Sequence, residues 1–174
     1  MITNLTYIQQ LNFDGTTYRK GGVFRLDSKW KIVCQDFPFK RNPKPKELPS
    51  RDWAGEDGLD VYIPQKLPVQ SYDIEVPFLY VGTEEDIRTD IASFIDYLYG
   101  RNAGAVGSRL AIYNTYADMG RKDVVVSEVN DDLFFLTNHD PDAVARFKVK
   151  FTVHDPTTEL ALKKEGYIVT DLTF

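Results

Sequence analysis

Few side chains in this sequence are suited to acid–base or nucleophilic chemistry. The 174 residues include two histidines, His139 and His154, and a single cysteine. A histidine next to a carboxylate can act as a general base, and His154 directly precedes Asp155. A catalytic pair also needs a third convergent group, and this pair stands at an expected strand end before Pro156. We therefore interpret His154 and Asp155 as polar strand-end residues and predict no catalytic residue.

Metal and cofactor sites lack their usual patterns. A tetrahedral zinc site needs several His or Cys ligands at definite spacing, and two histidines with one cysteine do not supply them. The acidic segment 52–60 lacks the spacing of an EF-hand. Its glycines are not followed by the Gly-Lys-Ser/Thr ending of a phosphate-binding loop. Cys34 shares the buried face of an alternating strand with Trp30 and Ile32, which predicts an inert core thiol. We expect no metal and no cofactor.

A basic stripe is the clearest charge pattern. Arg146, Lys148 and Lys150 alternate with five apolar residues: Ala145, Phe147, Val149, Phe151 and Val153. Nucleic acid is one conceivable partner, but no aromatic residues for base stacking share the cationic face, and the net charge of −5 disfavours a dedicated nucleic-acid binder. Cations of this kind protect exposed sheet edges. We therefore expect 145–154 to be an edge strand, with no specific nucleic-acid partner.

The best-marked element is an amphipathic helix over about 83–99. Thr83 and Asp86 form a pattern like a capping box at its start, and Gly100 provides a stop. Between them, apolar residues recur at helical spacing: Ile87, Ile91, Phe94, Ile95 and Leu98.

Segments of period two surround this helix and predict strands. They include 29–39, 72–81 and 145–154, and a hairpin formed by 110–116 and 124–129. Pro77 places the second segment at a sheet edge or a bulge, because proline cannot donate to a ladder. The sequence thus predicts a mainly β (α+β) fold, an antiparallel sandwich or barrel-like core with one main helix. No run of apolar residues is long enough for a membrane span.

We expect one domain over residues 1–156. Residues 157–174 form a C-terminal extension with a short helix (158–164) and a strand (167–172), and no separate second domain. Within the domain, the proline-rich, basic segment 40–49 predicts an extended, exposed loop. It is either a solvated connector, which we favour, or a basic arm that contacts a partner. The following segment 51–60 is a tight turn.

The order of these elements resembles the N-terminal domain of the distal tail proteins of long-tailed bacteriophages and prophages. The matching segments are the turn 54–60, the strand 72–78, the helix end 94–98, the strand 110–113 and the cationic strand 146–153, which runs into Asp155-Pro156. That family commonly has a Gly-Arg-Asp-Gly-type turn, and Glu56 stands here where it often has Arg. Members often carry a further C-terminal β domain, whereas only residues 157–174 follow the matching part. We therefore expect the ring-forming part alone.

The resemblance implies a virion structural protein of the tail tube or baseplate hub, assembled in the bacterial host cytoplasm and located in the virion tail. Its partners would be other copies of itself in a hexameric ring, together with tail tube and tail tip proteins. Such a protein works through interfaces and is not an enzyme. We expect the subunit interface to use the 51–58 turn and the 145–154 strand, through Arg51, Asp52, Trp53, Gly55, Asp57, Gly58, Arg146, Lys148 and Lys150.

Three alternatives stay open. The chain could be the tail-tube subunit itself, which shares the sandwich-plus-helix plan. It could be a β-sandwich module that binds a carbohydrate or a cell surface without catalysis, since Trp30, Trp53 and ten tyrosines are present. A hydrolase that uses two carboxylates is the third, because the separation of such a pair in space is not readable from sequence.

Overall fold

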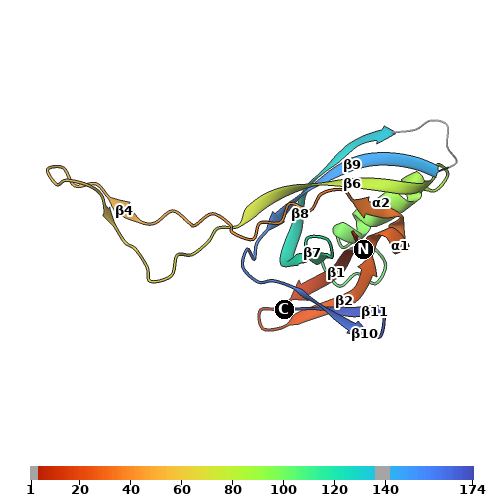
Figure 1. Ribbon diagram of the computed structural model, residues 1–174, viewed down its shortest axis with the longest axis horizontal. Coiled ribbons are helices and arrows are strands. Elements are labelled where there is room, and N and C mark those ends of the chain that lie inside the picture. The colour runs from red at the N-terminus through yellow and green to blue at the C-terminus, as the bar shows by residue number, and fades with distance from the viewer. Residues whose placement is uncertain (1–3, 136–141) are drawn as a thin grey trace.

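The computed structural model describes residues 4–135 and 142–174. Seven antiparallel strands form its main sheet, in the spatial order β2-β1-β7-β8-β9-β6-β3 (Figure 1). These strands are β1 (Thr6–Phe13), β2 (Tyr18–Arg25), β3 (Ile32–Cys34), β6 (Tyr72–Thr83), β7 (Arg109–Asn114), β8 (Met119–Phe135) and β9 (Asp142–Val153). The mainly β, sandwich-like fold expected from the alternating segments is confirmed.

Two helices, α1 (Leu26–Trp30) and α2 (Ile87–Leu98), pack on one face of this sheet (Figure 1). The contact is mainly aromatic. The ring of Phe94 lies 5.3 Å from Trp30, 5.4 Å from Phe78 and 6.2 Å from Phe147, measured between centroids. Phe94 itself is fully buried. Aromatic pairs at these separations add to the free energy gained from burying their surface, so this cluster fixes the helix on the sheet.

The predicted helix exists, but it begins four residues after Thr83. Thr83 is still part of β6 and pairs with Asp142 of β9. Its hydroxyl donates to the Asp86 carboxylate over 2.9 Å, and Asp86 occupies the N-cap position. The helix therefore begins later than predicted, because the backbone of Thr83 pairs with β9 in the sheet.

Helix α1 lies where the sequence predicted the start of a strand. Leu26 and Trp30 are buried at its two ends, and the left-handed backbone of Lys31 (φ 56°) ends it. Only Ile32–Cys34 then form the predicted strand. The four-residue spacing of Leu26 and Trp30 fits a helical turn, and burial against α2 decides the outcome.

The C-terminal helix predicted over 158–164 is wrong. This segment contributes instead to a hairpin of β10 (Ala161–Glu165) and β11 (Ile168–Thr173), with Gly166 in the turn at φ 63°. The hairpin covers a second, smaller core on the opposite side of β1 and β7, made of Leu11, Ala111, Tyr113, Leu160 and Leu172. Leu160 and Leu172 gain burial there that an isolated short helix would not supply.

The expectation of an edge strand at 145–154 is also wrong. Strand β9 lies inside the sheet and pairs with β8 on one side and β6 on the other. Pro77 of β6 is tolerated because its carbonyl oxygen accepts from the amide of Gln35, just beyond the last residue of β3. The missing proline N–H therefore faces a place where the ladder has already ended.

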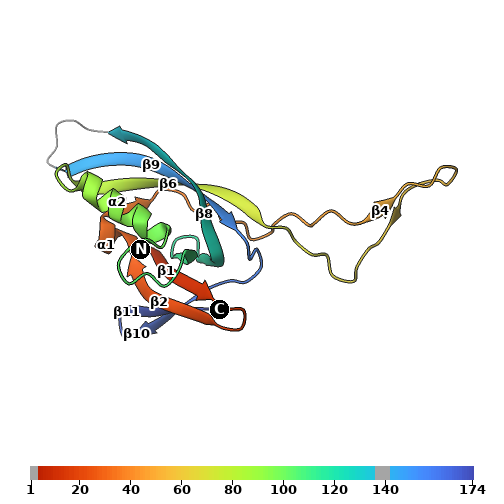
Figure 2. The ribbon, with the colours of Figure 1, turned by 180° about the vertical axis from the view of Figure 1, so that it is seen from behind.

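A long two-stranded arm leaves the body between β3 and β6 (Figures 1 and 2). Near its base Pro45 and Val69 form an isolated bridge. Further out β4 (Ser50–Arg51) pairs with β5 (Asp60–Val61), and the turn between them forms the tip. We expected the segment 40–49 to be a solvated connector. In the structure it forms part of one side of a projecting hairpin, and residues 60–70 form the other side.

We expect Phe94→Ala to lower the free energy of unfolding by about 3–5 kcal/mol, because it empties the centre of the aromatic cluster. Urea denaturation followed by circular dichroism measures the change. Arg88→Ala on the exposed side of the same helix is the control and should stay within about 0.5 kcal/mol of the unmodified protein. Equal effects of the two changes would contradict this account of the core.

Candidate functional site

The predicted tip residues lie together at the end of the arm. Arg51, Asp52, Trp53, Gly55, Asp57 and Gly58 all fall within or beside the turn between β4 and β5, and all are exposed. The two glycines have φ values of 97° and 91°, a region that residues with a side chain seldom adopt. The expectation of a tight turn at 51–60 is therefore correct, and the turn stands far from the body (Figure 1).

Large apolar side chains are exposed along the arm. The exposed fractions are 50% for Trp53, 56% for Leu59, 69% for Tyr62, 73% for Ile63 and 48% for Leu67. In the part of the chain that the structure describes, no second layer packs on these two strands, so about half or more of each side chain stays exposed. Several large apolar side chains exposed on one short arm indicate a site of protein interaction.

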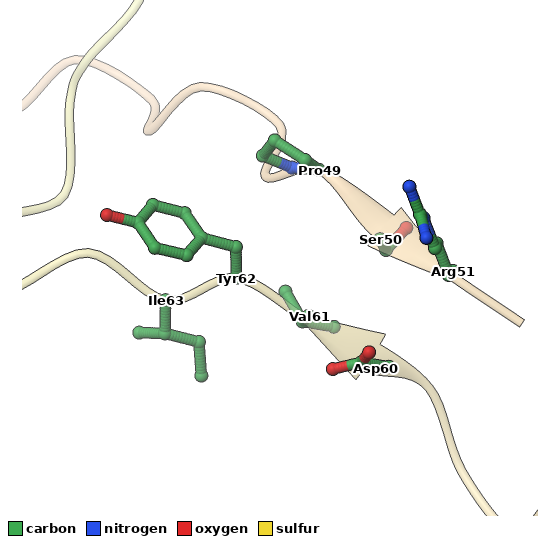
Figure 3. A pocket seen from close by; sticks show the side chains of 7 residues that line it. All are labelled: Pro49, Ser50, Arg51, Asp60, Val61, Tyr62 and Ile63. Atoms are coloured by element: carbon green, nitrogen blue, oxygen red, sulfur yellow. The ribbon is translucent and has the colours of Figure 1, made fainter.

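The two strands also frame a shallow hollow of about 460 Å³. In Figure 3 the side chains of Tyr62 and Ile63 project to opposite sides of their strand. Backbone pairing holds the frame, since the amide of Tyr62 donates to the carbonyl of Pro49 over 3.1 Å. Seven residues line the hollow: Pro49, Ser50, Arg51, Asp60, Val61, Tyr62 and Ile63. It offers apolar side chains together with Arg51 and Asp60, which carry opposite charges on paired strands, to an incoming surface.

The base of the arm is tied to the body through Arg121. This side chain is almost completely buried, with 1% of its surface exposed. Its guanidinium donates to the carbonyl of Lys40 over 3.0 Å and to the carbonyl of Thr158 over 3.1 Å. The hydroxyl of Tyr72, at the other end of the arm, accepts from the amide of Lys40 over 3.1 Å. Both ends of the arm are thereby held at one place, which gives its base a defined direction.

The three cationic residues of β9 lie on the main sheet and not on the arm. They project from the sheet face opposite α2, where Lys148 contacts Glu75 at 2.8 Å and Lys150 contacts Glu128 at 2.7 Å. The hydrogen bond to Glu128 raises the pKa of Lys150. Arg146 is exposed on the same face. The predicted interface residues therefore form two separate groups, and the role of the β9 group in an interface stays a prediction.

Asp155 serves a turn. Its carboxylate accepts from the amide and the hydroxyl of Thr158, over 3.0 and 2.7 Å, and from the amide of Thr157 over 3.2 Å. Partial burial pushes the pKa of Asp155 upward, but these hydrogen bonds outweigh it and leave the pKa below its usual value. The bonds stabilise the turn after β9, as expected for a strand-end residue. His139 lies outside the described residues.

Several arm residues escaped the sequence analysis. Tyr62, Ile63 and Leu67 are exposed beside the predicted tip, yet the segment 61–70 received no assignment. The available signal was symmetry: prolines at 43, 45 and 49 before the turn are matched by prolines at 64 and 68 after it. Prolines on both sides of a turn favour a hairpin that no third strand joins, because proline has no backbone N–H to donate to a neighbouring strand.

No protein-family model and no curated protein sequence matches this chain. Among the described residues, no group of three or more His, Cys, Asp or Glu side chains is placed to hold a metal ion. In the same part of the chain, neither helix has the length and apolarity to cross a bilayer. The clearest candidate site is the arm, because its large apolar side chains are exposed.

The thiol of Cys34 should not react with a thiol reagent while the protein is folded. The side chain is 2% exposed, and burial raises its pKa to about 12, so little of the reactive thiolate forms near neutral pH. We expect no labelling by a disulfide-exchange reagent at pH 8 and one equivalent after unfolding in urea. Rapid labelling of the folded chain would show that this strand opens.

Replacing Arg121 with Met should loosen the arm at its base. The carbonyl groups of Lys40 and Thr158 lose a buried donor through two partly buried hydrogen bonds, and we expect the free energy of unfolding to fall by about 1–3 kcal/mol, with faster hydrogen exchange at the amide of Lys40. Arg41→Met is the matched control. Arg41 also donates to backbone carbonyls, those of Ala117 and Asp118, but from an exposed position, so its loss should matter much less.

Proposed function

We propose that this protein is an assembly subunit that associates with copies of itself through the arm, and that the assembly is a ring in a phage or prophage tail, between the tail tube and the tail tip. The observation that carries the proposal is the arm, with its uncovered apolar residues and anchored base. The order of elements that resembles the distal tail family supplies the tail context.

The physical argument concerns what such an arm can stabilise. An isolated two-stranded hairpin is marginally stable in water, and this one exposes Trp53, Tyr62 and Ile63 at once. Docking against another subunit removes that surface from water, at about 25 cal/mol per Å² of apolar area. Trp and Tyr are also the side chains that most often dominate binding energy at protein interfaces. The arm therefore gains most from an intermolecular contact.

The arm can be removed without touching the body. Pro45 and Val69 are already paired across its base, so an Asn-Gly turn can replace residues 46–68 and close the hairpin there. We expect the unmodified chain to form a discrete oligomer in multi-angle light scattering. The shortened chain should be monomeric, with an unchanged circular dichroism spectrum, because the core does not include residues 46–68.

Two results would contradict the proposal. One is an unmodified chain that stays monomeric at its highest soluble concentration. The other is a shortened chain that forms the same oligomer as the unmodified chain. If the arm instead proves necessary for retention on a polysaccharide, while the oligomeric state is unaffected by its removal, the carbohydrate-binding alternative replaces this one.

A further inference from the structure

Two adjoining hollows lie on the body beside α1, and we call them together the α1 groove. They have volumes of about 280 and 400 Å³ and share Phe24 and Lys29 in their linings. The smaller one extends toward Trp30 and Tyr97. The larger one extends to the C-terminal hairpin, where Tyr167 is fully exposed and Ile168 is 72% exposed.

The α1 groove combines aromatic surface with positive charge. The Lys29 ammonium stands 4.2 Å from the ring centroid of Phe24, and no carboxylate among the described residues forms an ion pair with it. Arg25 lies in the same lining, paired with Asp27 at 2.6 Å. A ligand that suits this surface carries an apolar or aromatic group together with negative charge.

The arm tip has that chemistry. Trp53 is half exposed, and the turn around it holds four acids against one cation: Asp52, Glu56, Asp57 and Asp60 against Arg51. The turn projects beyond the paired strands and therefore can enter a hollow. A surface with an aromatic side chain and an acidic rim is complementary in both respects to the α1 groove.

The arm of one copy points away from its own groove. In both views the arm leaves the body at one end of the longest axis, whereas α1 and the C-terminal hairpin lie in the remote half of the body (Figures 1 and 2). Resting on the assembly function proposed above, we propose that the α1 groove of one copy receives the acidic, Trp53-bearing arm tip of the next copy. This contact joins two different surfaces, so it propagates head to tail and closes into a ring or continues as a filament.

Complementation between two variants tests this contact. The arm variant is Trp53→Ala with Asp57→Lys, and the groove variant is Lys29→Glu with Ile168→Asp. All four positions are exposed, so the fold should persist, as circular dichroism can verify. A control variant, Arg88→Glu with Tyr116→Asp, makes similar changes at exposed positions outside both surfaces.

We expect each of the two variants alone to be monomeric, with self-association weakened by about tenfold or more, while the control variant assembles like the unmodified chain. Mixing the arm variant with the groove variant should give a 1:1 dimer in native mass spectrometry. That mixture still offers one intact arm and one intact groove, and the dimer cannot grow further.

The possible failures are distinguishable. If the groove variant assembles normally while the arm variant does not, the arm docks elsewhere: the groove inference is overturned and the assembly function stands. If both variants are monomeric and their mixture is also monomeric, the intact arm of one variant does not bind the intact groove of the other, and the inference is again overturned. If the unmodified chain itself is monomeric, the proposed function fails and this inference fails with it.

Discussion

The placement of the arm depends on one buried cation. A guanidinium removed from water must find acceptors for its donors, because an unsatisfied buried charge is very costly. Arg121 meets part of this requirement by drawing in the carbonyl of Lys40, where the arm begins, and the carbonyl of Thr158, where the C-terminal segment begins. Its Nε has no partner among the described residues. The side chain thus connects the sheet, the arm and the C-terminal hairpin, three parts that pack mostly against different neighbours.

The two faces of the sheet differ in what covers them. One face carries α1 and α2 over an aromatic core. The opposite face is covered by the C-terminal hairpin over β1, β2 and β7. Over β6 and β9 the same face is charged and carries ion pairs. Exposed pairs of this kind add little stability. They keep the uncovered half of the sheet hydrated, while the backbone of β9 pairs with a strand on each side.

The arm reverses the usual relation between burial and hydrophobicity. Its apolar residues are exposed, whereas the polar or charged residues Gln9, Gln10 and Arg121 are buried in the body. Natural proteins also restrict exposed strand edges that invite pairing, and prolines on both strands of the arm have that effect. The arm consequently offers side chains rather than open backbone to a partner, which favours a specific docked contact over indefinite strand addition.

Sequence patterns alone determined the mainly β class, the helix around 87–98 and the buried state of Cys34, because side-chain periodicity is a local property. The predicted cap at Thr83 is wrong, because this residue is part of β6. Sequence patterns also located the tight turn at 51–58, since closely spaced glycines and acids mark a turn wherever it stands. Only the tertiary structure decided the rest. Whether β9 is an edge or an interior strand depends on which strands join it, and whether 158–164 is a helix or a strand depends on the β1–β7 face that it covers. That the turn is the tip of a projecting arm depends on the pairing of 44–51 with 60–70. The prolines of 40–49 had pointed only to a loop, and 61–70 had no predicted element.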